Sequence, residues 1–300
     1  MSKREKYYYI YIICIIVLLF AIFYGSTSEG FQDNTQDNTR EEIIDTFIPK
    51  TVDSPNEVSG IPLVIYRSWI TNSLPIRMKN TVMKTIALTP EFDNHFFSDE
   101  DCHNFIRDNF EPNVLNAYNC LKPAAFKSDF WRCCILYKRG GVYFDIKLEL
   151  HLRLYEILQK YPKIFIRDRI SEPEISTPLL TDFPLWNGIM SSAPGNPVFK
   201  ACIDEVIVSC KNRDYKQNMF DITGPYQLGR MVDKYEGLSF SKNLPFIHRI
   251  HRQIHYFDEL FTTEYEGYRD DQKRMALVKV KHYGDLYRER DVYDESVIYL

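Results

Sequence analysis

The sequence predicts an α/β fold in which a mostly parallel sheet is flanked by helices. Strand-like runs alternate with stretches of helical periodicity, in the order 61–69, 74–88, 91–97 and 98–110. The second of these helices has Ser98 at its N-cap and Asp101 at the capping-box position. A hydrophobic fraction of 45% is sufficient for a sizeable core. Together these observations indicate the start of a parallel α/β sheet.

The same alternation continues toward the carboxyl end. Pro123 opens a helix that runs to about Lys138, and Gly140 and Gly141 end it. The later elements are expected as a strand at 142–146, a helix at 152–159, strands at 163–167 and 186–193, and helices at 198–210 and from about 226. After 239 the pattern weakens to short strands and aromatic loops, and nothing marks a further domain boundary between 60 and 300.

Charge and cysteine content argue against two kinds of site. The chain has 37 basic and 41 acidic residues and a net charge of −4, so nothing favours nucleic acid as a partner. None of the seven cysteines belongs to a CxxC pair, which argues against a structural zinc site. The function is therefore expected to involve a substrate other than nucleic acid.

An uncharged apolar run over 7–24 is expected to cross a membrane, because a spanning helix needs about 20 apolar residues. Basic residues precede the run and acidic residues dominate after it, which by the positive-inside rule places the amino terminus in the cytosol. We therefore expect 1–25 to be the cytosolic tail and transmembrane anchor of a single-pass type II membrane protein, with the remainder in an ER- or Golgi-like lumen. A signal peptide cleaved near 25–28 is the alternative.

Residues 26–59 are expected to form a flexible stem. They contain the tetrapeptide QDNT twice in succession at 32–39, and such polar repeats bury too little surface to offset the entropy of ordering. A short helix around 41–47 is the one regular element expected in this stretch. The folded domain is then expected to occupy 60–300.

The stretch that is most informative about function lies in the middle of the chain. The helix after Pro123 carries Ser128, Asp129 and Arg132 on one face, because residues three and four apart are neighbours on a helix. The strand that follows the two glycines delivers Asp145 at its carboxyl end. In open parallel α/β sheets, ligands bind beyond those ends. A polar helix face beside a strand-end carboxylate is an arrangement that can bind a phosphorylated sugar.

The block from 122 to 149 resembles the donor-site block of glycosyltransferase family 32, which includes yeast mannosyltransferases and animal α1,4-galactosyltransferases. The shared pattern is Ser-Asp with a nearby Arg, an apolar helix end, Gly-Gly-x-Tyr and the start of Asp-x-Asp. Asp129 and Arg132 match positions that hold the donor sugar in the family, and Tyr143 and Asp145 match the start of its metal-binding strand end. Weaker matches, in the family's order, lie at 61–69, 187–188, 194–197 and 223–225.

The resemblance implies a GT-A-type fold, a Rossmann-like sheet with a nucleotide-sugar site at its strand ends. It implies a glycosyltransferase that moves a hexose from a UDP- or GDP-sugar to a hydroxyl of a glycan or glycolipid, with retention of the anomeric configuration. With the apolar run at 7–24, we expect this enzyme to be membrane-anchored. Asp129, Arg132 and Asp145 are expected to be central to catalysis. The residues expected to bind the donor are Tyr66, Trp69, Ser128, Asp129, Arg132, Tyr143, Asp145, Lys147 and Asn187. Core packing is the alternative for Tyr66 and Trp69.

Lys147 departs from the family pattern, because it stands where the second Asp of Asp-x-Asp ligates Mn²⁺ or Mg²⁺. An ammonium cannot ligate a cation, but it can neutralise a phosphate as a point charge. Three interpretations follow. Asp145 and Glu149 share a strand face and hold the metal, with His282 as a late ligand; Lys147 replaces part of the charge of the metal; or the site has decayed, and the chain is a membrane-tethered glycan-binding or scaffold protein.

Overall fold

The computed structural model of the chain describes residues 40–168, 184–237, 246–250, 252–275 and 281–299. The expected anchor and the tetrapeptide repeat lie outside these ranges. Within them, no helix combines the length and the apolar character needed to cross a membrane. From Glu41 onward, the described residues belong to one compact unit.

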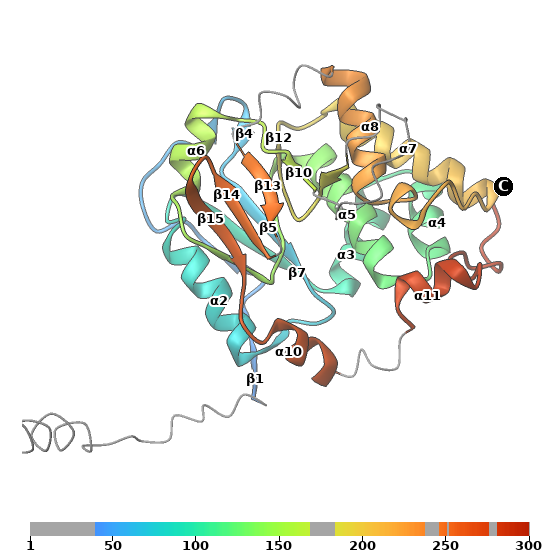
Figure 1. Cartoon of the computed structure of the whole chain (residues 1–300), viewed down its shortest axis with the longest axis horizontal. Helices are drawn as coiled ribbons and strands as arrows, with labels where there is room; N and C mark the ends of the chain where they lie inside the picture. Colours follow the sequence, from blue (N-terminus) through green and yellow to red (C-terminus); the bar gives the residue numbers. More distant parts are fainter. Residues whose placement is uncertain (1–39, 169–183, 238–245, 251, 276–280, 300) are drawn as a thin grey trace, which may run out of the picture. The chain divides into compact units, whose positions relative to one another are not determined.

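The centre of this unit is a five-stranded sheet with the order β12-β8-β5-β7-β2. Strands β5, β7 and β12 of this sheet are labelled in Figure 1. Its three inner strands are parallel, with β5 (Val64–Ser68) between β7 (Asp93–Phe97) and β8 (Gly141–Phe144). The two edge strands, β12 (Ile189–Ser192) and β2 (Phe47–Ile48), are antiparallel to their neighbours. The expected α/β class is therefore confirmed, with a sheet that is parallel at its centre and antiparallel at its edges.

Helices flank this sheet on both sides, as the sequence predicted. Their bounds are α2 Ile76–Ala87, α3 Asp99–Asn109, α4 Pro112–Cys120, α5 Ala124–Arg139, α6 Leu154–Lys160, α7 Pro197–Asn212, the 3₁₀ helix η1 Met219–Asp221, α8 Pro225–Glu236, α10 Tyr268–Arg274 and α11 Tyr283–Arg288. The capping box of α3 is present, since the Asp101 N–H donates to Ser98 Oγ at 3.1 Å and the Ser98 N–H donates to Asp101 Oδ2 at 2.9 Å. The sequence did not predict α4.

A second, four-stranded antiparallel sheet lies in the carboxyl-terminal half, with the order β13-β14-β15-β9. Its strands are β13 Phe246–Ile250, β14 Gln253–Tyr256, β15 Glu259–Glu264 and β9 Leu148–Leu150. Three strand pairs are smaller: β1 Glu41–Ile43 with β6 Ser73–Pro75, β3 Glu57–Val58 with β4 Ile61–Pro62, and β10 Ile166–Arg167 with β11 Leu185–Trp186. Because β9 follows the central strand β8 almost at once, the two sheets are joined close to Asp145.

The prediction of a short helix around 41–47 is wrong. This stretch forms β1 and the start of β2, and β2 pairs with β7 at the edge of the central sheet. Ile44, between the two strands, is 3% exposed and packs in a cluster with Leu74 and Met78. Burial of this side chain and pairing of the open edge of β7 outweigh the local helical spacing. The part of the expected stem after residue 40 is thus attached to the folded unit.

The core lies on both faces of the central sheet, because neighbouring residues of a strand point in opposite directions. Ile65 and Val142 belong to a cluster that also contains side chains of α6, β14 and β15. Tyr66 and Tyr143, one position along in each strand, belong to a cluster formed mainly with α3, α4, α5 and α7. Central strands that are buried on both faces explain why they appear as nearly continuous apolar runs.

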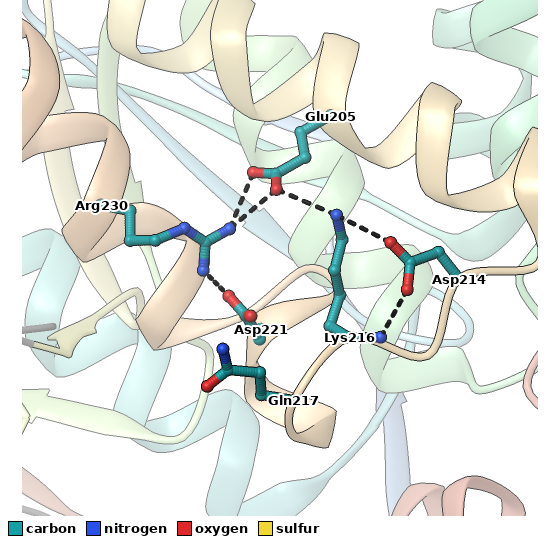
Figure 2. A pocket seen from close by; sticks show the side chains of 6 residues that line it. All are labelled: Glu205, Asp214, Lys216, Gln217, Asp221 and Arg230. Carbon is teal, nitrogen blue, oxygen red and sulfur yellow. Dashed lines mark hydrogen bonds and ion pairs between the residues drawn. The ribbon is translucent and has the colours of Figure 1, made fainter. Parts of the chain in front are cut away.

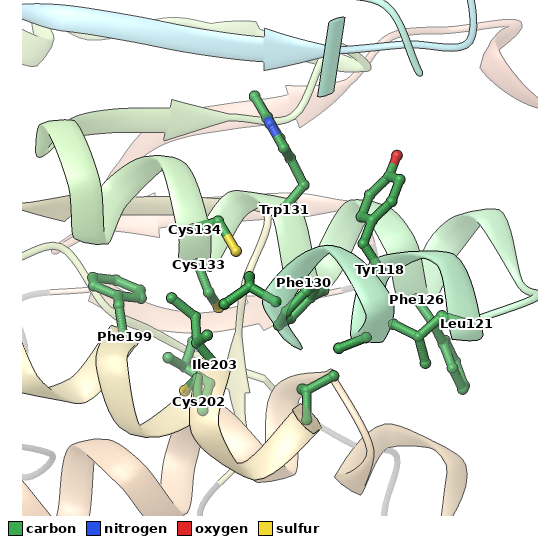
Figure 3. Close-up of a cluster of buried hydrophobic side chains, with 14 of the residues drawn as sticks. Tyr118, Leu121, Phe126, Phe130, Trp131, Cys133, Cys134, Phe199, Cys202 and Ile203 are labelled. Atoms are coloured by element: carbon green, nitrogen blue, oxygen red, sulfur yellow. The ribbon is translucent and has the colours of Figure 1, made fainter. Parts of the chain in front are cut away.

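Helix α5 is held between the sheet and α7. Figure 3 shows Phe130 and Cys133 on the side of α5 that meets α7, where Phe199 packs, and Trp131 pointing toward the strands. The Trp131 ring lies 6.2 Å from that of Tyr143. Since both of these sides are packed, the polar side chains of α5 are fixed in direction.

The Gly140-Gly141 turn connects the end of α5 directly to the start of β8. Both residues have positive φ, +66° and +88°, which side chains disfavour. A Cβ on Gly141 would also lie 2.8 Å from the Val64 carbonyl oxygen, and one on Gly140 would lie 2.6 Å from Pro194 Cδ. The two glycines therefore allow β8 to lie close beside β5 directly after the helix.

Candidate donor-binding site

The predicted site residues converge at the carboxyl end of β8. Asp145 is the first residue after the strand, and its N–H donates to the carbonyl oxygen of Gly188 at 2.8 Å. That bond ties the strand end to the turn between β11 and β12. The polar face of α5 and the loop before α8 meet the same point, so three further segments contribute side chains to it.

Asp129 is held by residues far away in the sequence. Asn187 Nδ2 donates to its Oδ1 at 2.9 Å, and Thr223 Oγ1 lies 3.4 Å from its Oδ2. The sequence predicted Asn187 as a donor-binding residue, and Thr223 lies in the weaker family match at 223–225. The structure places both on the same carboxylate.

Arg132 links the helix to the strand end. Its Nη1 donates to the Asn187 carbonyl oxygen at 2.7 Å and lies 3.5 Å from Asp145 Oδ1. Its Nη2 donates to Ser128 Oγ at 3.0 Å and lies 3.4 Å from Asp129 Oδ1. The guanidinium lies 4.4 Å from the centre of the Tyr143 ring, a cation–π distance. Arg132 is therefore locked between the two carboxylates that the sequence singled out.

Both oxygens of Asp145 face positive or hydrogen-bonding partners. The Tyr143 hydroxyl donates to Oδ1 at 2.8 Å, and Arg132 approaches the same oxygen. Lys147 Nζ lies 3.2 Å from Oδ2. The carboxylate is 13% exposed, so its hydrogen-bonding capacity is directed mainly at these three side chains.

The two carboxyl groups have pKa values shifted in opposite directions. Burial raises the pKa of Asp129 to about 6, because Arg132 only partly compensates for the lost water and Asp145 repels the charge. Burial also acts on Asp145, but the charges of Lys147 and Arg132 outweigh it and hold the pKa of that carboxyl below its ordinary value. A pair of carboxyls separated in this way is a common property of functional sites.

The residues present do not fit a divalent cation. Position 147 is an ammonium that is already paired with Asp145, and such a group repels a metal. Leu148 N–H donates to the Asp145 carbonyl oxygen at 3.1 Å, which closes a turn between β8 and β9. The prediction that Asp145 and Glu149 share a strand face is therefore wrong, because a turn at 146–147 separates the two strands. Across the described ranges, no group of three or more His, Cys, Asp or Glu side chains is arranged to hold a metal.

The two other proposed metal ligands have structural partners. Glu149 lies in β9, where its Oε1 is 3.0 Å from Lys84 Nζ. His282 caps α11, since its Nδ1 accepts from the Gly284 N–H at 3.1 Å. The interpretation in which Asp145, Glu149 and His282 together hold the metal has no support from this geometry.

Tyr66 and Trp69, which the sequence predicted either to bind the donor or to pack in the core, lie in different surroundings. Tyr66 is 3% exposed and packs in the core beside His95 and Phe97. Trp69 follows the carboxyl end of β5, is only partly buried, and lies against Tyr268 with ring centres 6.3 Å apart. Core packing therefore accounts for Tyr66, whereas Trp69 remains at the edge where a ligand of this site would lie.

The amino-acid sequence is similar to known sugar transferases over this same region. Residues 75–163 match the family model described as the glycosyltransferase sugar-binding region containing the DXD motif. This segment of the chain therefore resembles the sugar-binding region of that family. The matched segment includes the polar face of α5, the glycine pair, Asp145 and Lys147, so the resemblance seen in the motifs is confirmed.

Curated relatives come from fungi and from a virus. Inositol phosphoceramide mannosyltransferase 2 of Schizosaccharomyces pombe is 28% identical over 62% of this chain and 51% of its own length. Mannosyl phosphorylinositol ceramide synthase of Saccharomyces cerevisiae is 26% identical over 81% of this chain and 59% of its own length. An uncharacterized glycosyltransferase of Acanthamoeba polyphaga mimivirus is 30% identical over 46% of this chain and 53% of its own length. The chain thus spans about half the length of the relatives it matches.

Among solved structures, the PaToxG glycosyltransferase has a TM-score of 0.43 and 12% sequence identity. The match covers 77% of this chain and 85% of that one.

Tyr268 also lies at this site, although the sequence did not predict it as a site residue. It begins α10, lies against Trp69, and has Lys147 Nζ 5.7 Å from the centre of its ring. Asp271, which is fully buried, fixes this helix to α2 because Arg77 Nη2 lies 2.7 Å from its Oδ1. No local motif marks Tyr268 in a chain that has 21 tyrosines, so only the fold reveals it.

A separate polar pocket of about 260 Å³ lies between α7, η1 and α8 (Figure 2). Arg230 lies 2.8 Å from Glu205 and also contacts Asp221, while Lys216 lies 3.2 Å from Glu205 and 3.1 Å from Asp214. Every charged side chain that lines this pocket is therefore paired with another of the set. We call these five residues the α7–α8 network, and we interpret them as structural.

Proposed function

We propose that this chain transfers a hexose from a nucleotide-diphosphate sugar to a hydroxyl of a glycolipid or glycan. The observation that carries the proposal is the convergence of Asp129, Arg132 and Asp145 at one strand end, inside the segment that matches the sugar-binding family. The names of the fungal relatives favour mannose as the sugar and an inositol phosphoceramide as the kind of acceptor.

Each side chain has a role that its chemistry supports. The Asp129 carboxylate, oriented by Asn187 and Thr223, accepts hydrogen bonds from the sugar hydroxyls. Arg132 keeps that carboxylate in place and links it to the strand end. When the bond between the sugar and the diphosphate breaks, negative charge develops on the departing phosphate oxygen. A fixed cation near that oxygen stabilises the transition state.

The test is hydrolysis and transfer by the purified full chain, with GDP-mannose, other GDP-sugars and common UDP-sugars as donors. Release of the nucleoside diphosphate above background with one donor, and its loss in Asp145→Asn, are expected. Background rates with every donor would overturn the proposal. Glycan binding that persisted alongside those background rates would favour the alternative of a decayed transferase that binds glycans or acts as a scaffold.

The proposal includes retention of the anomeric configuration, which rests on the family resemblance. Proton NMR of the first product, recorded before mutarotation, is expected to show the anomer of the donor. The opposite anomer would contradict retention while leaving the transfer reaction in place.

We also propose that the apolar run at 7–24 anchors the chain as a type II membrane protein, with the folded unit on the luminal side of an ER- or Golgi-like compartment. The support is the uncharged run itself, with basic residues before it and mostly acidic residues after it. The chain should resist alkaline extraction of membranes, and its folded unit should be protected from added protease. A mature amino terminus near Ser26 would show instead that the segment is cleaved.

A further inference from the structure

We propose that this chain binds the donor diphosphate without a divalent cation, and that the Lys147 ammonium, held between Asp145 and Tyr268, takes the place of the metal. This inference rests on the proposed function and specifies how its site binds the leaving group. It also explains the residue at which this chain departs from the DXD motif of its family.

Formal charge is the first argument. In the site, the carboxylates Asp129 and Asp145 face the cations Arg132 and Lys147, so the four charges cancel. With a carboxylate at 147, as in the DXD motif, the same four positions would carry a charge of −2, which one divalent cation neutralises. Replacing that carboxylate by an ammonium changes the charge by +2, the charge of the metal. The site is thus balanced by its own side chains.

The position of the ammonium is the second argument. Nζ lies 3.2 Å from Asp145 Oδ2, at the carboxyl end of the central parallel strands where ligands of such sheets bind. Asp145 takes one of the three N–H donors of an ammonium, and the side chain is 21% exposed. A phosphate oxygen can therefore approach Lys147 from solvent, whereas a metal would have to displace it from its carboxylate.

The support behind the ammonium is the third argument. The Tyr268 ring lies 5.7 Å from Nζ, within cation–π range, so the lysine has an aromatic wall on one side and a carboxylate on another. Tyr268 is itself fixed. The Arg77–Asp271 ion pair anchors α10, and Gly267 just before it has φ +88° and leaves no room for a Cβ beside the Arg77 guanidinium. A point charge held in this way needs little reorganisation when the diphosphate arrives.

The experiment measures binding of GDP and of UDP to the purified full chain by isothermal titration calorimetry, once with excess EDTA and once with MnCl₂. We expect one of the two nucleotides to bind with affinities that agree within about twofold in the two buffers. Lys147→Ala should weaken binding by about tenfold or more in both buffers, and Lys147→Arg should retain it. Lys147→Asp should lose binding in EDTA and recover it with MnCl₂.

Two further variants test the aromatic wall and the specificity of the charge effect. Tyr268→Phe keeps the ring and should bind like the wild type, whereas Tyr268→Ala should bind more weakly. Lys200→Ala removes an exposed lysine that pairs with Asp204 on α7, and should change nothing. Melting temperatures of all variants separate loss of binding from loss of fold.

The possible results distinguish this inference from the proposed function. Wild-type binding that disappears in EDTA and returns with MnCl₂ would overturn the inference and leave the proposed function standing. Wild-type affinity in Lys147→Ala would also overturn it. Failure of both nucleotides to bind in either buffer would overturn the proposed function and the inference with it.

Discussion

The candidate donor-binding site and the α7–α8 network are both made of alternating charges, but the pKa values of their carboxyl groups are shifted in opposite directions. In the site, burial raises the pKa of Asp129 to about 6. In the network, the Lys216 backbone N–H holds the pKa of Asp214 below its ordinary value, since it donates to that carboxylate at 2.8 Å. A buried carboxylate that is costly to ionise, such as Asp129 on α5, is typical of a functional site, whereas Asp214 is stabilised by a backbone N–H of its own loop.

The two places also differ in how far apart in the sequence their interacting residues lie. The network joins α7, η1, α8 and the loop between them, which are close in sequence. The site joins Asp129 to Asn187 and Thr223, which are 58 and 94 residues away. Ion pairs alone would have marked both places as sites. The location at the ends of the parallel strands is what distinguishes the first from the second.

The largest expected effect is that of Asp145→Asn. The change keeps the shape of the side chain but removes the charge that faces both Arg132 and Lys147. Turnover with the preferred donor should fall by about 10³-fold, the scale on which loss of a preorganised electrostatic group acts. The matched variant in the network, Glu205→Gln, should stay within about threefold of wild type. Equal losses in the two variants would erase the distinction between the regions.

The next effect is the pH dependence of turnover. Since burial raises the pKa of Asp129 to about 6, the carboxylate form is lost as the pH falls through that value. Turnover divided by KM should therefore decline on the acid side, with an apparent pKa of about 6. Asp129→Asn should be poorly active and should lack this limb. A wild-type profile that is flat down to pH 5 would mean that Asp129 does not act in its ionised form.

Breaking the network should affect stability rather than binding. Arg230→Met removes the cation that faces Asp221 and one of the two cations that face Glu205, the other being Lys216. It should lower the free energy of unfolding by about 2 kcal/mol, because partly buried carboxylates lose counter-charge. Urea denaturation measures this change, and nucleotide affinity should remain that of the wild type. Weaker nucleotide binding in the folded variant would assign the pocket to the donor site.

Asp129→Asn should do the reverse and stabilise the fold. The native state takes up a proton on Asp129 between about pH 6 and pH 4 that the unfolded chain does not, so this group lowers stability above pH 6 and has no such effect below pH 4. At pH 8 the variant should be more stable by about 1–2 kcal/mol. The gain should vanish near pH 4, and a gain that is independent of pH would point to another cause.

The smallest effect is expected at an exposed pair. Lys200 and Asp204 are four residues apart on α7, with side chains 47% and 53% exposed, so Lys200→Ala should change the unfolding free energy by less than about 0.5 kcal/mol. Chemical denaturation beside wild type measures it. A cost as large as that of Arg230→Met would show that burial is not what separates the network from the surface.

Sequence alone determined the features that depend on neighbouring residues. The capping box of α3, the start of α5 after Pro123, and the glycine pair were all predicted and are present. So were the shared face of Asp129 and Arg132 on α5 and the position of Asp145 at a strand end, because helical and strand periodicity fix such relations over a few residues. The departure at Lys147 was also visible from the sequence.

Only the tertiary structure decided which distant side chains meet. Thr223 and Asn187 reach Asp129 through loops, and Tyr268 reaches Lys147 from an unpredicted helix that Arg77 anchors from 194 residues away. Glu149 lies in β9, which pairs with β15, a strand more than a hundred residues later, and its carboxylate contacts Lys84 of α2. Such contacts depend on how packed layers fit together and not on local spacing. Lys147 and Asp145 were therefore evident from the sequence, but the ion pair between them and the Tyr268 ring beside the lysine were not.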